Sequence, residues 1–214
     1  MKNSYEENKD EIHGDGYDGD MQVSEAMRAY KGAGSYTYSD YVEWDIPENE
    51  KWELIDGKPY LMASANINHN DVQIEIVVQL YNYLRGKKCK VYTDVDTRLN
   101  LDTLDNTVVR PDVLVVCDKT KTSDRKAVAG APDFAVEILS PSNPKHDKVT
   151  KFKKYLEAGV REYWIVDPMT KTVAVNLLTD GEYSTQIHGE DAKVSSSALS
   201  GCVIDFEQVF SDVP

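Results

Sequence analysis

No run of apolar residues in this 214-residue sequence approaches the roughly 18 residues that a membrane-spanning helix needs. The first residues, MKNSYEENKDE, lack the basic region and the apolar block of a secretory signal peptide. Cysteine is scarce as well: Cys89, Cys117 and Cys202 are widely spaced and odd in number. Cys117 closes an apolar run, so we expect a small core residue there rather than a ligand or a nucleophile. A cytoplasmic location is therefore the default expectation.

Basic residues are in the minority, because 24 Lys and Arg stand against 37 Asp and Glu, for a formal net charge of −13. Most of this excess lies in residues 1–50, which hold 13 acidic and 4 basic residues, or −9; the rest of the chain carries only −4. The segment Lys145–Arg161 has six basic residues against Asp147 and Glu157. A near-neutral core with one basic helix can bind phosphates, weakly and with strong salt dependence. A solvated helix face would account for most of these lysines equally well.

The chain is expected to contain one folded domain preceded by a tail. Residues 1–34 are polar, acidic and rich in glycine, and we expect them to be largely disordered, with a short helix around 23–30. Their HGDGYDGD stretch lacks the spacing of a calcium-binding loop. With 41% hydrophobic residues, the remaining chain, residues 35–214, can bury one core.

Hydrophobic periodicity and turn residues predict strands between two principal helices. A hairpin at 51–62 is expected to turn at Asp56-Gly57. Further strands are predicted at 90–95, 97–101, 108–117, 134–139, 162–167, 172–178 and, as part of a last hairpin, 179–188. Helices are predicted at 40–44 (capped by Ser39), 68–84, 145–158 (capped by Ser142 or Asn143) and, as a single turn, 206–210. This alternation indicates an α/β or α+β fold.

Two carboxylates occur inside apolar runs: Asp112 in VVRPDVLVVC and Glu137 in PDFAVEILSPS. An ionised carboxylate in such surroundings costs several kcal/mol unless a cation or hydrogen-bond donors meet it. If the two strands are neighbours, the carboxylates could share one cation. The alternative is that each acid lies half-solvated at a strand end and pairs with Arg110 or a lysine.

A lysine is available on the helix that follows Glu137. Taking 100° per residue, Val149, Phe152 and Leu156 define the apolar face of this helix, and Lys151 falls on its border. From there its long side chain could lean over the sheet edge toward Glu137. The alternative is an ordinary exposed lysine.

Glu53 and His69 are weaker candidates for the same site. Glu53 lies between Trp52 and Leu54 in an apolar strand, and could serve as a further ligand of a metal or a water. His69 opens the long predicted helix, where a polar N-terminal residue is as plausible as a functional one.

These residues fall within five ordered motifs: WELIDGKPYLMA, His69, VRPDVLVVC, GAPDFAVEILSPSN and D-x-x-x-K-x-x-x-Y-x-x-AGVREYWIVDP. Together, from Tyr36 to Leu178, they resemble the Uma-two family of "putative restriction endonucleases", formerly a domain of unknown function, within the PD-(D/E)XK nuclease superfamily. The resemblance implies a restriction-endonuclease-like core in residues 35–214, with a central mixed sheet flanked by helices.

The resemblance also implies the site residues. Catalytic roles carry over to Glu53, Asp112, Glu137 and Lys151, and His69 stands at the position of a recurring histidine. The superfamily pattern has a lysine two residues after Glu137, where this chain has leucine. In the family that lysine has moved to the following helix, where this chain has Lys151.

The activity implied is Mg²⁺-dependent hydrolysis of DNA phosphodiester bonds, with Mn²⁺ as a substitute. Asp112, Glu137 and the carbonyl of Ile138 would hold the ion, which polarises the phosphate and activates a water. Lys151 would orient that water or neutralise the developing charge. A catalytically silent nuclease-fold binding module and a hydrolase of another phosphoester are the alternatives. A homodimer is compatible with all three, since the sequence does not determine the oligomeric state.

Overall fold

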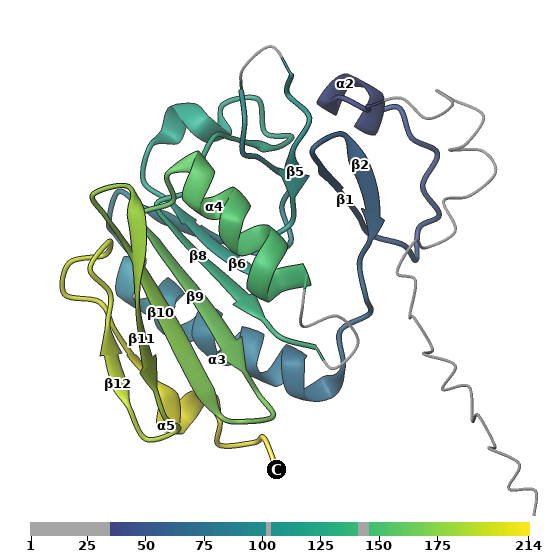
Figure 1. The fold of residues 1–214 in the computed structure, drawn as a ribbon. Coiled ribbons are helices and arrows are strands. Elements are labelled where there is room, and N and C mark those ends of the chain that lie inside the picture. The colour runs from purple at the N-terminus through teal and green to yellow at the C-terminus, as the bar shows by residue number, and fades with distance from the viewer. Residues whose placement is uncertain (1–34, 102–103, 141–145) are drawn as a thin grey trace, which may run out of the picture.

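The computed structural model describes residues 35–101, 104–140 and 146–214 (Figure 1). The predicted disordered segment 1–34, with its short helix at 23–30, lies outside the described residues, and so do the predicted caps Ser142 and Asn143. Within the described residues the chain is a mixed α/β structure built on two sheets. The α/β class and the mixed sheet predicted from the sequence are therefore confirmed.

The larger sheet has six strands in the order β11-β10-β9-β8-β6-β3. Neighbouring strands run antiparallel except β8 and β9, which are parallel. The bounds are β3 Lys90–Tyr92, β6 Val113–Val116, β8 Phe134–Ile138, β9 Glu162–Asp167, β10 Thr172–Thr179 and β11 Glu182–His188. The strands at the centre of this sheet are buried on both faces, as their continuous apolar runs predict.

A second sheet of five short strands has the order β2-β1-β5-β4-β7. Its hairpin turns at Asp56 and Gly57, both with positive φ, as the predicted turn requires. A separate two-stranded ribbon pairs β12 with β13. The bounds are β1 Trp52–Ile55, β2 Lys58–Leu61, β4 Thr97–Arg98, β5 Val108–Val109, β7 Val128–Ala129, β12 Lys193–Ser195 and β13 Val203–Asp205. Strands β7, β12 and β13 were not predicted from the sequence.

The prediction of a single strand at 108–117 is wrong. The segment divides into β5, which belongs to the five-stranded sheet, and β6, which belongs to the six-stranded sheet. Pro111 lies at the break, where its lack of an N–H group prevents it from donating to a strand ladder. The break places Asp112 where the chain passes from one sheet to the other.

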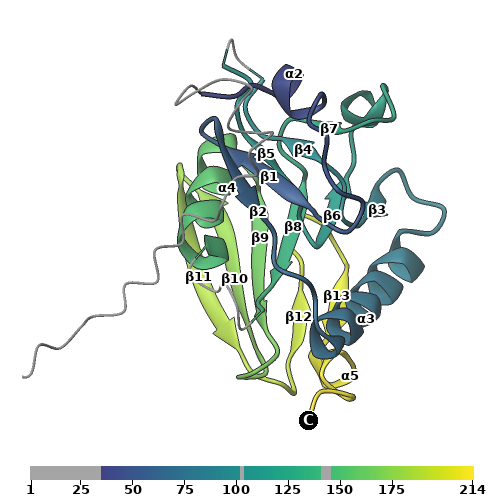
Figure 2. The same cartoon turned by 90° about the vertical axis from the view of Figure 1, so that its right-hand side faces the viewer.

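Two helices cover opposite faces of the six-stranded sheet, α3 (Ile67–Leu84) on one side and α4 (Phe152–Ala158) on the other (Figure 2). The face under α3 carries the largest core, which also takes in α5 (Phe206–Val209). The α4 face holds a second, more aromatic core. Short helices α2 (Tyr38–Tyr41) and η1 (Lys119–Thr122) complete the described structure. No helix among the described residues is long and apolar enough to cross a membrane.

Two predicted helices begin or wind differently from expectation. Thr37, not Ser39, caps the first, through a reciprocal pairing with Asp40. The helix predicted at 145–158 is a π-helix over His146–Lys151 that continues as α4 and ends, as predicted, at Gly159. A π-turn bonds residue i to i+5, so angular positions computed for an α-helix do not hold there. Val149, assigned to the apolar face, is accordingly 58% exposed.

Cys117 packs, partly buried, against the largest core, and it forms a disulfide with Cys89 that the expectation of a small core residue did not include. Lys90 of β3 pairs with Val116 of β6, so the next position along the ladder places Cys89 directly opposite Cys117. Cys202 is buried and has a free thiol, and burial raises its pKa to about 11. The low number of cysteines therefore gives no support for a reducing compartment.

Reduction of the Cys89–Cys117 disulfide is expected to destabilise the fold by about 2–4 kcal/mol. The bond closes a loop with a sequence separation of 28, and cross-links of this length restrict the unfolded chain by that order. Urea unfolding with and without a phosphine reductant measures the difference. An unchanged midpoint, with three titratable thiols in the untreated protein, would show that the bond does not form.

Candidate active site

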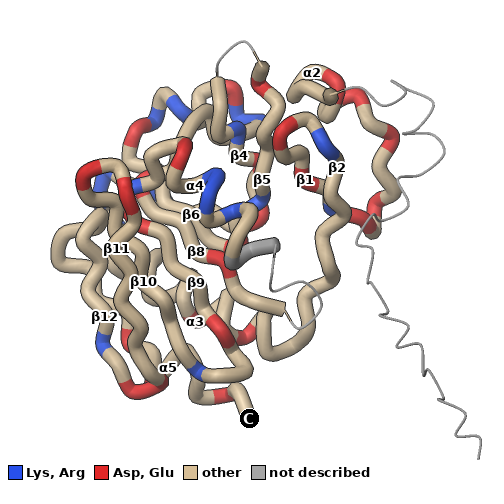
Figure 3. The backbone as a smooth tube through the Cα atoms, viewed as in Figure 1, with Lys and Arg blue, Asp and Glu red and all other residues tan. Residues whose placement is uncertain are grey.

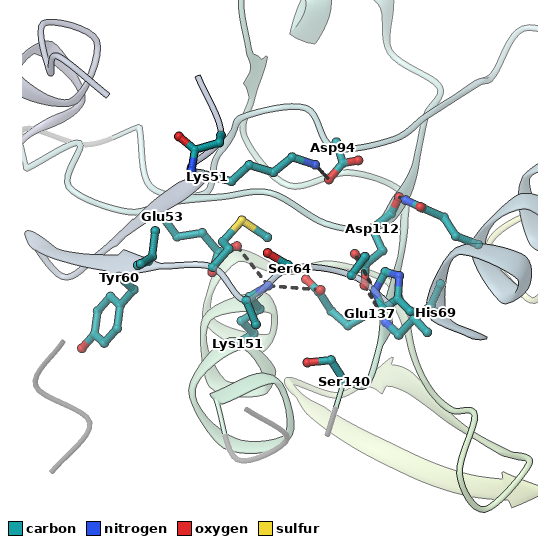
Figure 4. A pocket seen from close by; sticks show the side chains of 17 residues that line it. Lys51, Glu53, Tyr60, Ser64, His69, Asp94, Asp112, Glu137, Ser140 and Lys151 are labelled. Carbon is teal, nitrogen blue, oxygen red and sulfur yellow. Dashed lines mark hydrogen bonds and ion pairs between the residues drawn. The ribbon is translucent and has the colours of Figure 1, made fainter. Parts of the chain in front are cut away.

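A cavity of about 290 Å³ lies between the two sheets, beside the first turns of α3 and the end of the π-helix (Figure 4). Strands β1, β2 and β8 contribute to its wall, together with the segment 62–65 that leads from β2 toward α3. All five residues predicted to be catalytic line it, as does Ile138: they are Glu53, His69, Asp112, Glu137 and Lys151. Each of these five side chains is almost completely buried.

Asp112 and Glu137 face the same cavity from neighbouring strands. In the antiparallel register of β6 and β8, Val113 pairs with Val136, so the next step places Asp112 opposite Glu137. Directly opposite residues of an antiparallel pair project on the same face of the sheet. This arrangement is the one that a shared cation would need.

Hydrogen bonds hold the Asp112 carboxylate in place on both sides. Its Oδ2 accepts the main-chain N–H of Ile138 at 2.7 Å, and its Oδ1 lies 3.2 Å from Nε2 of His69. His69 in turn is fixed at the start of α3, where its main-chain N–H donates to the side chain of the cap Asn66. Gln73, one turn further along α3, donates to the carbonyl of Asp112 at 2.8 Å. The acid is therefore positioned by two different elements.

Lys151 is buried at the centre of the site rather than at the border of a helix face. It is only 2% exposed, and its Nζ lies 3.0 Å from Oε1 of Glu53 and 3.1 Å from Oε2 of Glu137. One ammonium group thus bridges carboxylates from the two sheets. The π-turn that ends at Lys151 explains why the α-helical angle misplaced it.

Tyr155 is a member of the site that sequence reasoning passed over. Its phenol donates a hydrogen bond of 2.6 Å to Oε1 of Glu137. Burial, and next the negative charge of Glu137, raise the pKa of Tyr155 well above its usual value, so the phenol remains a donor. Its spacing of four from Lys151 could have identified it, because residues four apart share one helix face.

Arg110 connects Glu53 to Asp94 and Asp96. Its main-chain N–H donates to Oε1 of Glu53 at 2.8 Å, while its guanidinium contacts Oδ1 of Asp96 at 3.0 Å and the carbonyl of Asp94 at 2.9 Å. The alternative in which Arg110 pairs with Asp112 is therefore wrong, whereas Glu137 does pair with a lysine, Lys151. Burial raises the pKa of Asp96, which the Arg110 charge opposes. At the mouth of the cavity Lys51 pairs with Asp94 at 3.0 Å.

The donor set fits a hard divalent cation. Among the described residues no group of three or more His, Cys, Asp or Glu side chains could hold a metal. The predicted set is smaller, comprising the carboxylates of Asp112 and Glu137 with the carbonyl of Ile138. Oxygen donors of this kind suit Mg²⁺, which keeps several of its waters. Donors behind both carboxylates hold them in orientation, as is usual around metal ligands.

Comparison with known proteins supports a nuclease fold. The family model Uma2, described as "Putative restriction endonuclease", matches residues 38–207. Two uncharacterised proteins of Synechocystis sp. are similar: slr1290 is 31% identical over 54% of this chain, and sll1609 is 26% identical over 76% of it. The matched segments span 60% and 93% of those proteins. A crystal structure described as a putative nuclease of DUF820 from Anabaena variabilis superposes with a TM-score of 0.68 at 21% identity, over 82% of this chain and 97% of the other.

Proposed function

Because the chain belongs to the Uma2 family of restriction-endonuclease-like proteins, we propose that it is a divalent-metal-dependent endonuclease that hydrolyses DNA phosphodiester bonds. The observation that carries the proposal is the meeting of Asp112, Glu137 and Lys151 in one buried cavity. Such a concentration of buried charge is costly for stability and typical of functional sites. The nuclease domain in this proposal comprises residues 35–214.

Each residue has a distinct role in the proposed reaction. Asp112, Glu137 and the carbonyl of Ile138 would hold Mg²⁺, or Mn²⁺ in its place, and His69 would keep the Asp112 carboxylate in orientation. When bound, the ion supplies Lewis-acid polarisation of the phosphate and lowers the pKa of a water. Lys151 neutralises charge that develops on the phosphate. Glu53 holds the Lys151 ammonium beside the reacting group.

The distribution of charge is compatible with a nucleic-acid substrate. Figure 3 shows basic positions on α4 and on the strands β2 and β4, interspersed with acidic ones. Binding through such a surface should be weak and should fall as salt rises. We propose a cytoplasmic location as well, where an intracellular DNA substrate would lie. A homodimer would present two cavities to the two strands of a duplex.

One observation favours a catalytically silent binding module as the second candidate. Lys151 and Tyr155 already satisfy both oxygens of Glu137 from within the chain. A fold that had lost its metal chemistry could keep these acids as an internal, charge-compensated network. A hydrolase of another phosphoester would use the same residues as the endonuclease.

Incubation with supercoiled plasmid and with single-stranded DNA tests the proposal. We expect cleavage with Mg²⁺ or Mn²⁺ and none with a chelator, because the carboxylates need the ion to act on a phosphate anion. Cleavage that persists in the chelator would exclude the metal role. DNA binding without cleavage would favour the binding module, and hydrolysis of a small phosphodiester but not of DNA would favour the third class.

A further inference from the structure

The two oxygens of Glu137 are held by two side chains one helical turn apart. Lys151, the last residue of the π-helix, contacts Oε2 at 3.1 Å, and Tyr155 in α4 donates to Oε1 at 2.6 Å. One side of the helix therefore supplies both partners of the carboxylate, a cation at Oε2 and a neutral hydrogen-bond donor at Oε1. These two partners differ in how readily they can leave.

Tyr155 is fixed by its surroundings. The residue has 0% exposure and belongs to the core under α4, where its ring centroid lies 4.7 Å from that of Tyr163. A side chain packed on all sides in this way has no room to change rotamer without opening the core. Its hydrogen bond to Oε1 of Glu137 is accordingly a fixed feature of the fold.

Lys151 can move away from Glu137 and still keep a carboxylate partner, because it also contacts Glu53. Its Nζ also lies 3.0 Å from Oε1 of Glu53, on the opposite wall of the cavity. The four-carbon stem of a lysine rotates easily, and the ammonium acts as a point charge without a required geometry. An arriving cation could therefore replace it at Oε2 of Glu137 while it remains beside Glu53.

We infer that Tyr155 is a positioning residue for metal binding: it anchors Oε1 of Glu137, so that Oε2 is the oxygen which exchanges the Lys151 ammonium for a divalent ion. The inference rests on the proposed function, because it concerns the metal site of that function. The Asp112 carboxylate also has one oxygen held by a fixed donor, since Oδ2 accepts the main-chain N–H of Ile138. Its Oδ1 faces Nε2 of His69 at 3.2 Å, so neither oxygen of Asp112 is without a partner in this structure.

Metal binding to full-length Tyr155→Phe tests the inference, with Mn²⁺ titrated calorimetrically in the absence of DNA. Loss of a hydrogen-bonding partner behind a metal ligand weakens affinity by roughly 10–100-fold, so a drop of about tenfold or more is expected. Tyr183→Phe is the matched control. Its phenol donates a hydrogen bond of 2.8 Å to the carbonyl of Val160 within the same core. Tyr183 does not line the cavity, so loss of its hydroxyl should leave Mn²⁺ affinity unchanged.

The outcomes separate the inference from the function on which it rests. If the wild type binds no Mn²⁺, the proposed metal site itself fails and the inference with it. If the wild type binds Mn²⁺, Glu137→Gln does not, and Tyr155→Phe binds like the wild type, only the role of Tyr155 is wrong. All titrations are carried out below the melting temperature of every variant, so that a difference in affinity does not reflect unfolding.

A second measurement needs no variant. In a crystal of the wild type soaked with Mn²⁺, we expect Tyr155 still on Oε1 of Glu137 and Lys151 withdrawn from Oε2. A Glu137 side chain that has turned away from Tyr155 to reach the ion would overturn the inference, even if Tyr155→Phe failed to fold.

Discussion

Lys151→Ala should abolish DNA cleavage and, at the same time, lower the free energy of unfolding by about 3–5 kcal/mol. The loss of activity follows from removal of the cation nearest the proposed phosphate site. The loss of stability follows from the burial of Glu53 and Glu137, which are 1% and 2% exposed and would be left without the cation that lies between them. From the sequence alone, a border lysine should have been removable without effect on folding.

A metal ion should partly reverse the defect in stability. Without Lys151 the carboxylates have a greater need for a cation, and a ligand that binds only the folded state stabilises it by mass action. Thermal unfolding with and without Mn²⁺ should therefore show a larger upward shift for Lys151→Ala than for the wild type. An equal shift in both proteins would mean that the ion binds elsewhere.

Lys154→Ala is the matched control for this effect. Lys154 lies on the same helix and also contacts two carboxylates, Asp56 and Glu157, each at 2.8 Å. Those partners are largely solvent-exposed, and exposed ion pairs contribute at most about 1 kcal/mol. Cleavage should be retained. Normal cleavage by Lys151→Ala, with loss in Lys154→Ala, would transfer the catalytic role to Lys154.

Asp112→Asn should reduce the rate of cleavage by at least about 100-fold. Loss of a residue that only supports a metal ligand reduces activity by up to about 100-fold, and loss of the ligand itself should cost no less. The amide keeps an oxygen that can accept the N–H of Ile138, so the local structure should survive. What is lost is the negative charge that would bind the ion. Initial rates of plasmid nicking over a range of Mg²⁺ concentrations measure the change.

Asp133→Asn controls for the hydrogen bonds alone. Asp133 precedes the opposite end of β8 and has the same type of partners, since it accepts the main-chain N–H of Cys117 at 2.7 Å and pairs with Arg161 at 2.6 Å. It does not line the cavity. We expect full cleavage from this variant. Equal losses in the two variants would show that Asp112 acts on stability and not on the metal.

Local pattern was sufficient for much of the secondary structure. The Asp56-Gly57 turn, the apolar face of α3 and the strands β8 and β9 all follow from the order of neighbouring residues. The break at Pro111 could also have been predicted, because proline cannot donate to a strand ladder. The valines on both sides favoured one continuous strand instead. The short strand β7 depends on a distant partner, β4, whereas β12 and β13 pair with each other but are too short to leave a local pattern.

For the site, the sequence by itself determined which acids are unusual, because a charge inside an apolar run is anomalous wherever the run folds. Asp112 and Glu137 were identified in this way. Only the tertiary structure decided that Lys151 is buried between Glu53 and Glu137, that Tyr155 completes the group, and that Cys89 meets Cys117. Periodicity fixes which face of an element is apolar, whereas the identity of its partners depends on how distant elements pack, and the π-helix over His146–Lys151 makes the α-helical angle unreliable for Lys151.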